Sequence, residues 1–401
     1  MKGLKGDTGA AGPTGDLEIY CALAQAKPFV YSNVPCRAQS YTVDTGGAND
    51  VGSMPSVEIG TDGSPVISYY DSTTANLEVA RCNDPLCASG DETLSTVDIT
   101  NDVGSYSSLA IGADGNPVIS YVDATAHQLK LVHCNDPACA GDDETANAVA
   151  GFVSSSETSL AIDADGNPLI SYRTYFLDSG DLRLAHCNDP ACAGGDDPSQ
   201  TIDAGAAVVG SHTSLALGLD GNPVISYYDA TNGDLKVAHC NDLACAPGGD
   251  TVTAVDSAGS VGAFTSLAIG ADGNPVISYA DVGNTNLKVA RCNDPACVGG
   301  NETLSTVDDT GNVGSDTSIV IGHDGNPIVS YLDNGGGHLK VARCNDPACA
   351  GHNEALGVVD PAPNVGHDTS IALGLEGIAV VAHRDATNGD LKVGHPPVTG
   401  S

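Results

Sequence analysis

The chain has 401 residues, of which 51 are acidic and 15 are basic, so its formal net charge is −36. This charge excludes a nucleic-acid binder, which needs a basic surface, and it disfavours contact with an anionic membrane. No apolar run approaches the ~20 residues of a membrane-spanning helix, so we expect no membrane insertion.

The chain opens with Gly-X-Y triplets, a pattern typical of a collagen triple helix. We therefore expect residues 1–16 to be the end of a stalk that makes the protein a homotrimer. Residues 17–39 are predicted to form a connector closed by a disulfide between Cys21 and Cys36. Because residues 1–16 lack the apolar core of a signal peptide, the sequence favours a fragment of a longer secreted protein, or a virion protein.

Residues 40–401 hold seven copies of one segment with a period of about fifty residues, which is typical of propellers and arrays. In the fourth copy we expect strands over 214–218, 223–228, 235–239 and 251–255, named A to D in chain order. Glycines in the turns between them supply the positive φ that tight hairpins require. Four strands in each copy match one propeller blade.

The two ends of the repeat array complement each other. The seventh copy stops after its third strand, and residues 40–44 are similar to the fourth strand of the other copies. We therefore expect the N-terminal strand to complete the seventh blade and close the ring, which removes exposed sheet edges. The predicted fold is an all-β, seven-bladed β-propeller of four-stranded blades, preceded by a short collagen-like triple-helix segment.

Six Cys-x4-Cys units recur with the same period, and we predict a local disulfide in each. Zinc would need four ligands brought together, whereas these pairs would lie apart around the ring. The predicted pairs are Cys82 with Cys87, Cys134 with Cys139, Cys187 with Cys192, Cys240 with Cys245, Cys292 with Cys297 and Cys344 with Cys349. Such bonds imply an oxidising location, which is extracellular, on a cell-surface appendage or on a virion surface.

The repeated motif also carries a family resemblance. The pattern SLAxGxDGNPxISYYDATNGDLK is similar to repeats in secreted bacterial β-propeller proteins with sialidase-like blades. The resemblance covers residues 40–395 and implies the fold, while it leaves the activity open. The Gly-X-Y start resembles the stalks of bacterial and phage fibre proteins.

An aspartate recurs at the start of the turn between strands B and C. Aspartate at the first position of a turn caps its own backbone, and a calcium site is the alternative role. The six residues are Asp71, Asp123, Asp229, Asp281, Asp333 and Asp385. Apart from calcium, we expect no cofactor.

The third copy departs from the others by two extra residues in its B–C turn. This insertion carries Arg173, Tyr175, Phe176 and Asp178, and exposed aromatic residues beside an arginine are typical of binding sites. The alternative is an insertion without function. Because strand direction alternates, the B–C turns share one face, and we expect that face to be distal to the stalk.

A tyrosine recurs in strand B, and its regular recurrence predicts packing between blades with a hydrogen-bonded hydroxyl. The tyrosines are Tyr69, Tyr121, Tyr172, Tyr227, Tyr279 and Tyr331, with His383 in the seventh copy.

The near-identical blades favour a protein that is not an enzyme. Glycoside hydrolysis needs two carboxylates across one substrate, and we found no such pair and no nucleophile motif among the repeats. We therefore expect an extracellular head on a trimeric stalk, which binds a cell-surface glycan or protein receptor through its distal face. A structural subunit of an appendage, filament or virion fibre is the alternative, and a sialidase-like glycoside hydrolase ranks third.

Overall fold

The computed structural model describes the propeller but not the N-terminal segment. The described residues are 37–141, 143–151, 153–176, 179–195, 197–204, 208–374 and 377–397, without the side chains of 153–156, 175, 176 and 179. The predicted stalk, residues 1–16, and the predicted disulfide of Cys21 and Cys36 lie outside these residues.

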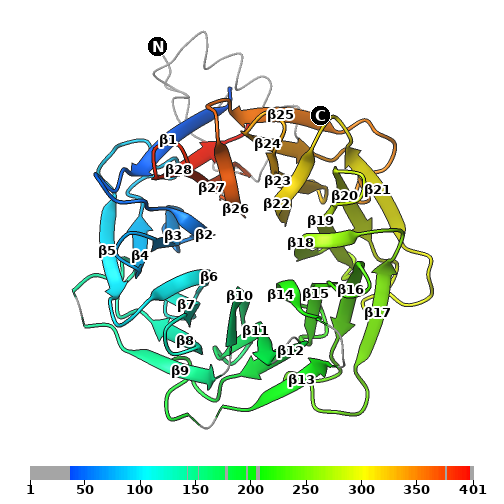
Figure 1. Ribbon diagram of the computed structural model, residues 1–401, viewed down its shortest axis with the longest axis horizontal. Helices are drawn as coiled ribbons and strands as arrows, with labels where there is room; N and C mark the ends of the chain where they lie inside the picture. Colours follow the sequence, from blue (N-terminus) through cyan, green and yellow to red (C-terminus); the bar gives the residue numbers. More distant parts are fainter. Residues whose placement is uncertain are drawn as a thin grey trace, which may run out of the picture.

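Seven four-stranded antiparallel sheets surround a central axis like the blades of a propeller (Figure 1). The innermost strands, A, are β2 (Ser53–Ile59), β6 (Val103–Ile111), β10 (Val153–Ile162), β14 (Ser211–Leu217), β18 (Val261–Ile269), β22 (Val313–Ile321) and β26 (Val365–Leu373). Strands B are β3 (Pro65–Asp71), β7 (Pro117–Asp123), β11 (Pro168–Phe176), β15 (Pro223–Asp229), β19 (Pro275–Asp281), β23 (Pro327–Asp333) and β27 (Ala379–Asp385). Strands C are β4 (Asn76–Arg81), β8 (Gln128–His133), β12 (Ser179–His186), β16 (Asp234–His239), β20 (Asn286–Arg291), β24 (His338–Arg343) and β28 (Asp390–His395). The outermost strands, D, are β5 (Thr93–Asp98), β9 (Ala146–Gly151), β13 (Ser199–Asp203), β17 (Thr251–Asp256), β21 (Thr303–Asp308), β25 (Ala355–Asp360) and β1 (Gln39–Asp44).

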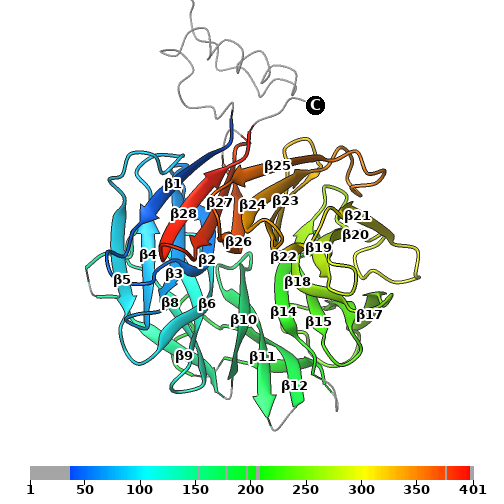
Figure 2. The same ribbon diagram turned by 45° about the horizontal axis from the view of Figure 1, so that its top comes forward.

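The ring closes through strands from the two ends of the propeller. Strand β1 pairs antiparallel with β28, with Tyr41 opposite Val393, and it forms the outer strand of the seventh blade. Figures 1 and 2 show the two strands side by side. The predicted all-β, seven-bladed fold and its closure by the N-terminal strand are therefore confirmed.

The apolar core lies between neighbouring blades. Between the fourth and fifth blades, Leu235 and Val237 of β16 pack with Leu267 and Ile277 of the next blade. Because apolar and polar residues alternate along the strands, each blade presents an apolar face to its neighbour. Each core is thus shared by two neighbouring blades. These interfaces, which we call seams, hold the ring together.

A polar cluster repeats at these seams, and it contains the recurrent tyrosine. Tyr279 is buried, and its hydroxyl donates to Asp256 Oδ2 of the preceding blade at 2.7 Å. Lys288 from strand C binds the same carboxylate and lies 5.4 Å from the centre of the tyrosine ring. The predicted packing of this tyrosine between blades, with a bonded hydroxyl, is therefore correct.

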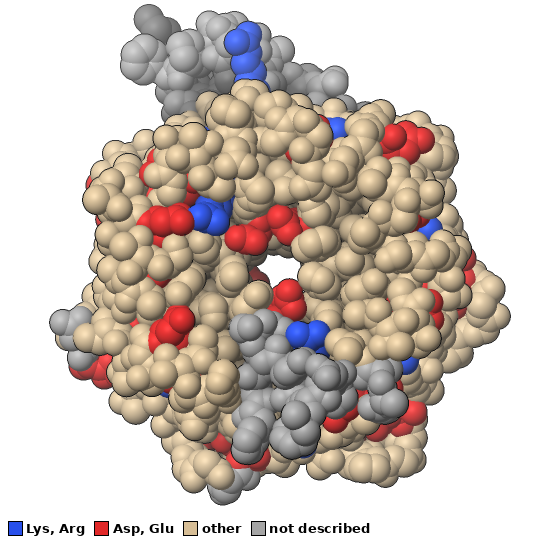
Figure 3. Space-filling view, viewed as in Figure 1, with Lys and Arg blue, Asp and Glu red and all other residues tan. Residues whose placement is uncertain are grey.

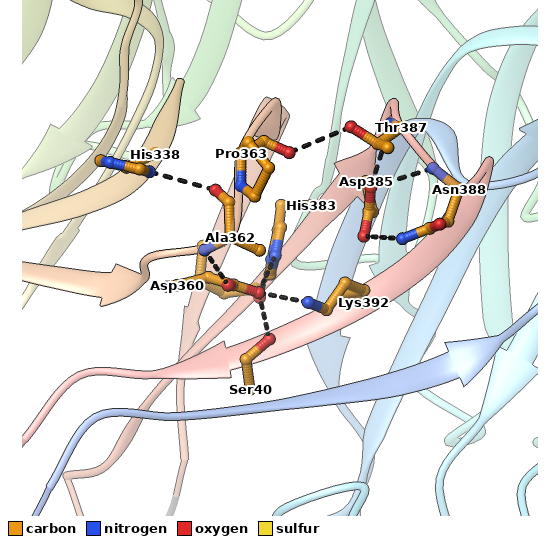
Figure 4. A network of polar contacts seen from close by, with 11 residues as sticks. Ser40, His338, Asp360, Ala362, Pro363, His383, Asp385, Thr387, Asn388 and Lys392 are labelled. Atoms are coloured by element: carbon orange, nitrogen blue, oxygen red, sulfur yellow. Dashed lines mark hydrogen bonds and ion pairs between the residues drawn. The ribbon is translucent and has the colours of Figure 1, made fainter. Parts of the chain in front are cut away.

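We call this arrangement of an aspartate, a tyrosine or histidine, and a lysine the seam cluster. The five seam clusters are Asp98 with Tyr121 and Lys130, Asp203 with Tyr227 and Lys236, Asp256 with Tyr279 and Lys288, Asp308 with Tyr331 and Lys340, and Asp360 with His383 and Lys392. Figure 4 shows the last of them, in which Ser40 of β1 also donates to Asp360.

Two seams depart from this pattern. At the closing seam, Tyr69 still donates to Asp44 at 2.7 Å, but Glu78 stands where the other blades have a basic residue. At the seam of the second and third blades, Ala150 replaces the aspartate, because it pairs with Leu129 as Asp98 pairs with Leu77. Tyr172 donates instead to Ser199 Oγ, or accepts from it, within its own blade at 2.6 Å.

All six predicted Cys-x4-Cys pairs form disulfides, which staple the turns between strands C and D. Six such bonds indicate an extracellular or secreted protein. Within the described ranges, the structure has no helix long and apolar enough to cross a membrane.

Strand A begins earlier than the sequence predicted. In the fourth blade we expected residues 214–218, whereas β14 starts at Ser211. The added residues are polar, so they lack the apolar alternation that marks a strand. The backbone bulges between Ser211 and Ser214, and His212 takes a positive φ of 52°. This bulge recurs around the axis and builds the site described next.

Candidate functional site

The six B–C turn aspartates lie in six different blades, where they cap their own turns. Asp229 Oδ1 accepts the backbone N–H groups of Thr231 and Asn232 at 3.1 Å, and Oδ2 accepts Asn232 Nδ2 at 2.9 Å. Comparable bonds to the turn backbone occur at Asp71, Asp123, Asp281, Asp333 and Asp385. The structure does not bring these carboxylates together, and calcium binding at them stays a prediction.

Three possible metal ligands converge at one place within the described part of the chain. They are Cys187, Cys192 and Asp197, whose ligand atoms lie within 4.8 Å of one another. The two sulfurs are joined in a disulfide and so are not thiolate ligands.

The insertion of the third blade lengthens a hairpin and does not form a separate loop. Strands β11 and β12 stay paired as far as Phe176 opposite Ser179. Arg173 is half-buried, and its Nη1 donates to Ser211 Oγ at the start of the next blade's strand A, at 2.6 Å. The side chains of Tyr175 and Phe176 lie outside the described residues, as does all of Asp178.

A set of residues that the sequence reasoning missed lines the central channel. They occupy one position, in the bulge of strand A, and differ in kind around the axis, although the residues after them repeat. We call them the channel ring: Met54, Tyr106, Glu157, His212, Phe264, Asp316 and Asp368. Together they line a cavity of about 200 Å³. Figure 3 shows an opening through the centre of the disc, with Asp and Glu side chains at its margin.

The backbone of the channel ring is strained. All members except Glu157 have positive φ values, between 50° and 55°. For residues other than glycine, this conformation costs about 1–2 kcal/mol each. The ring lies closer to the B–C turns than to the Asp-Gly turns, because its bulge faces the last third of strand B, as between Ser105 and Ser108 in β6.

Glu157 and His212 form an ion pair within the ring. His212 Nδ1 lies 3.2 Å from Glu157 Oε1, and the backbone N–H of His212 donates to Oε2 at 3.1 Å. The His212 ring packs against Phe264, with 4.5 Å between ring centres. Burial alone would raise the pKa of Glu157, but the hydrogen bond and charge of His212 lower it to about 2. Glu157 is therefore held as a carboxylate.

Asp316 has the opposite character. Burial and the neighbouring Asp368 carboxylate raise the pKa of Asp316 to about 6. The backbone N–H of Asp368 donates to Asp316 Oδ2 at 3.2 Å, and Asp368 Oδ2 in turn accepts the N–H of Met54 at 3.2 Å. Asp316 thus carries a proton under mildly acidic conditions.

The ring combines two carboxyl groups whose pKa values are pushed apart across one cavity. Glu157 belongs to β10 and Asp316 to β22, two strands that lie three blades apart on opposite sides of the axis (Figure 1), and the charge of Glu157 also acts on Asp316. One ionised and one protonated carboxyl group facing one cavity are the parts needed for general acid–base catalysis.

The comparisons with known proteins identify the fold and no family. No protein-family model matches the chain, and no curated protein matches it in sequence. Among solved structures, it is similar to a polysaccharide lyase of family PL25, an ulvan lyase, at 14% identity and a TM-score of 0.58, over 89% of this chain and 95% of the other. It is also similar to the polysaccharide lyase Uly1 (10% identity, TM-score 0.50, 86% and 90%). The GH93 α-L-arabinofuranosidase of Fusarium graminearum, in complex with arabinobiose, matches at 11% identity and a TM-score of 0.50, over 72% and 91%.

These neighbours overturn the expectation of a non-enzymatic head and its structural alternative, because they are enzymes that act on glycans. At 10–14% identity they share the fold with this chain, and they assign it no residue roles. The expectation failed because it weighed residues that repeat in every blade, whereas the paired carboxyl groups lie at a position that varies. That variation, two positions before the repeated serine of strand A (Ser214 in the fourth copy), is the signal that could have revealed the ring.

Proposed function

We propose that the protein is a glycoside hydrolase whose active site is the channel ring. One observation carries this proposal: an ionised Glu157 and a protonated Asp316 line the same cavity, with pKa values of about 2 and about 6. The names of the structural neighbours, an arabinofuranosidase among them, support a glycan as the substrate. The disulfides are consistent with a hydrolase that acts outside the cell.

The proposed reaction divides the two carboxyl groups into an acid and a base. Asp316 gives its proton to the glycosidic oxygen as the bond from that oxygen to the anomeric carbon breaks. Glu157 takes a proton from the water that adds to this carbon, or attacks the carbon itself before water replaces it. His212 keeps Glu157 ionised and fixes its orientation through the 3.2 Å contact.

The charge of the ring favours hydrolysis over elimination. A lyase that removes a proton beside a uronate carboxylate must first bind an anionic sugar. Here the cavity carries Glu157, Asp316 and Asp368, and the whole chain has a net charge of −36. Repulsion between like charges in a partly enclosed site would oppose such a substrate. The sugar that fits is therefore neutral or cationic.

Sugar release from oligosaccharides and p-nitrophenyl glycosides at pH 5 tests the proposal. We expect Glu157→Gln to lower kcat on both by about 10²–10⁴-fold. Asp316→Asn should lower kcat by the same factor on oligosaccharides and by far less on nitrophenyl glycosides, because nitrophenolate leaves without a proton. Asp165→Asn, at an exposed turn, is the matched control. The proposal is wrong if the wild-type protein cleaves none of these glycosides, or if both ring variants keep wild-type rates.

A further inference from the structure

The charges in the channel cavity do not balance. Its lining holds three carboxyl groups and the imidazole of His212, and the described residues that line it include no lysine or arginine. His212 pairs with Glu157 through its ring and its backbone N–H, and Asp316 acts as the proposed acid. Asp368 transfers no proton in that chemistry, although its charge helps to raise the pKa of Asp316, and among the described residues it forms no ion pair. A cavity with this excess of negative charge favours a ligand that carries a positive charge.

We infer that the preferred substrate is a glycoside of a cationic amino sugar and that Asp368 binds its ammonium group. The inference rests on the proposed hydrolysis at the channel ring and deepens it by naming the substrate class. An ammonium that donates to a carboxylate makes a charge-assisted hydrogen bond, which is stronger than the bond of a neutral hydroxyl.

Aromatic side chains of the ring suit the same ligand. Burial and the charges of Glu157 and Asp368 raise the pKa of the Tyr106 hydroxyl, the charge of Arg173 opposes them, and Tyr106 lines the same cavity as Asp368. Phe264 supplies a second ring on the far side of the cavity. Apolar sugar faces and ammonium groups both pack favourably against aromatic rings.

The protein already binds ammonium groups in this manner at its seams. In four of the seam clusters, a lysine Nζ pairs with an aspartate and lies 5.4–5.6 Å from the centre of a tyrosine ring. The channel offers Asp368 and Tyr106 to a ligand ammonium with the same chemistry. Its volume of about 200 Å³ lies below that of drug-sized sites, so it suits a single sugar unit.

Calorimetric titration of wild-type protein with monosaccharides tests the ligand class without requiring catalysis. We expect glucosamine to bind at least about tenfold more tightly than glucose, and glucuronic acid to bind more weakly than glucose. Added salt should weaken glucosamine binding and leave glucose unchanged. Equal affinities for glucosamine and glucose would overturn the inference.

Asp368→Asn assigns the effect to one carboxylate. Asparagine keeps an oxygen for the N–H of Met54 and tolerates a φ of 52°, so the bulge should persist. We expect the preference for glucosamine to fall to about twofold or less, while Asp165→Asn retains it. A full preference in Asp368→Asn would contradict the assignment, and an unchanged circular dichroism spectrum and Tm verify that the variant is folded.

The two proposals fail in different ways. If glucosamine binds preferentially through Asp368 and no glycoside is cleaved, the ligand class stands and the hydrolase is refuted. If glycosides are cleaved and amino sugars are not preferred as ligands or as substrates, the hydrolase stands and the amino-sugar inference is refuted.

Discussion

The closing seam should be less stable than its sister seams, because Glu78 faces Asp44 where five other seams have a lysine. Burial and the charges of Asp71 and Asp44 raise the pKa of Glu78 to about 7, from an ordinary 4.5. The folded state therefore binds this proton more tightly than the unfolded state does. As a result, the stability of the protein falls as pH rises from about 4.5 to 7, and the full penalty applies above pH 7.

The size of this penalty follows from the pKa change. A rise from 4.5 to about 7 would correspond to about 3 kcal/mol if it were fully felt. Glu78 is only partly buried, and solvent screens its charge, so we expect about 1–2 kcal/mol. Glu78→Gln should recover this amount at pH 8, and Glu78→Lys should recover more because it pairs with Asp44. For a domain of this size, the gain corresponds to a Tm increase of about 1–3 °C.

Thermal unfolding followed by circular dichroism at pH 8 and pH 4 measures the effect. At pH 4 the glutamate is protonated in the native state, so Glu78→Gln should match the wild-type protein there. Lys288→Gln, at a sister seam, is the control that should lower Tm, because Asp256 loses its ammonium partner. A gain of equal size at both pH values, or no gain at pH 8, would refute the reasoning.

The remaining predictions concern the other stabilising features. Ala150→Asp restores the carboxylate that Tyr172 lacks and should add about 1 kcal/mol in urea unfolding; a loss would count against the seam cluster. Each disulfide joins cysteines five positions apart and contributes about 2 kcal/mol, so reductant should lower Tm, and an unchanged Tm would contradict this. Burial opposes ionisation of Asp256 and Asp308, but lysine partners lower their pKa values, so Tm should fall as pH drops below about 4. A Tm that held steady to pH 2 would argue against these pairs.

Most of the fold could be predicted from the sequence, because each structural feature recurs in several copies of the repeat. The Asp-Gly turns, the strand B tyrosines and the cysteine pairs recur in six of the seven blades. The closing role of residues 40–44 followed from a seventh copy that lacks its fourth strand. What repeats in this chain serves packing, and packing can be read from periodicity.

The candidate site could not be predicted in this way, because its residues do not repeat from blade to blade. Ser211, His212 and Thr213 carry no apolar alternation, so the first half of strand A did not look like a strand. Because the bulge turns one residue per blade toward the axis, positions about 52 residues apart in the chain meet, as Asp316 and Asp368 do. Sequence spacing alone could not show that Glu157 and Asp316 share a cavity, since that depends on closure of the ring.

The most direct test of the central claim is the pH dependence of kcat/KM for oligosaccharide cleavage. We predict that the rate falls above about pH 6, where Asp316 loses its proton, while Glu157 stays ionised down to about pH 2. Asp368→Asn should move the upper limb to lower pH, because it removes the charge that helps to raise the pKa of Asp316. An upper limb that lies elsewhere and does not move in Asp368→Asn would contradict a catalytic channel ring.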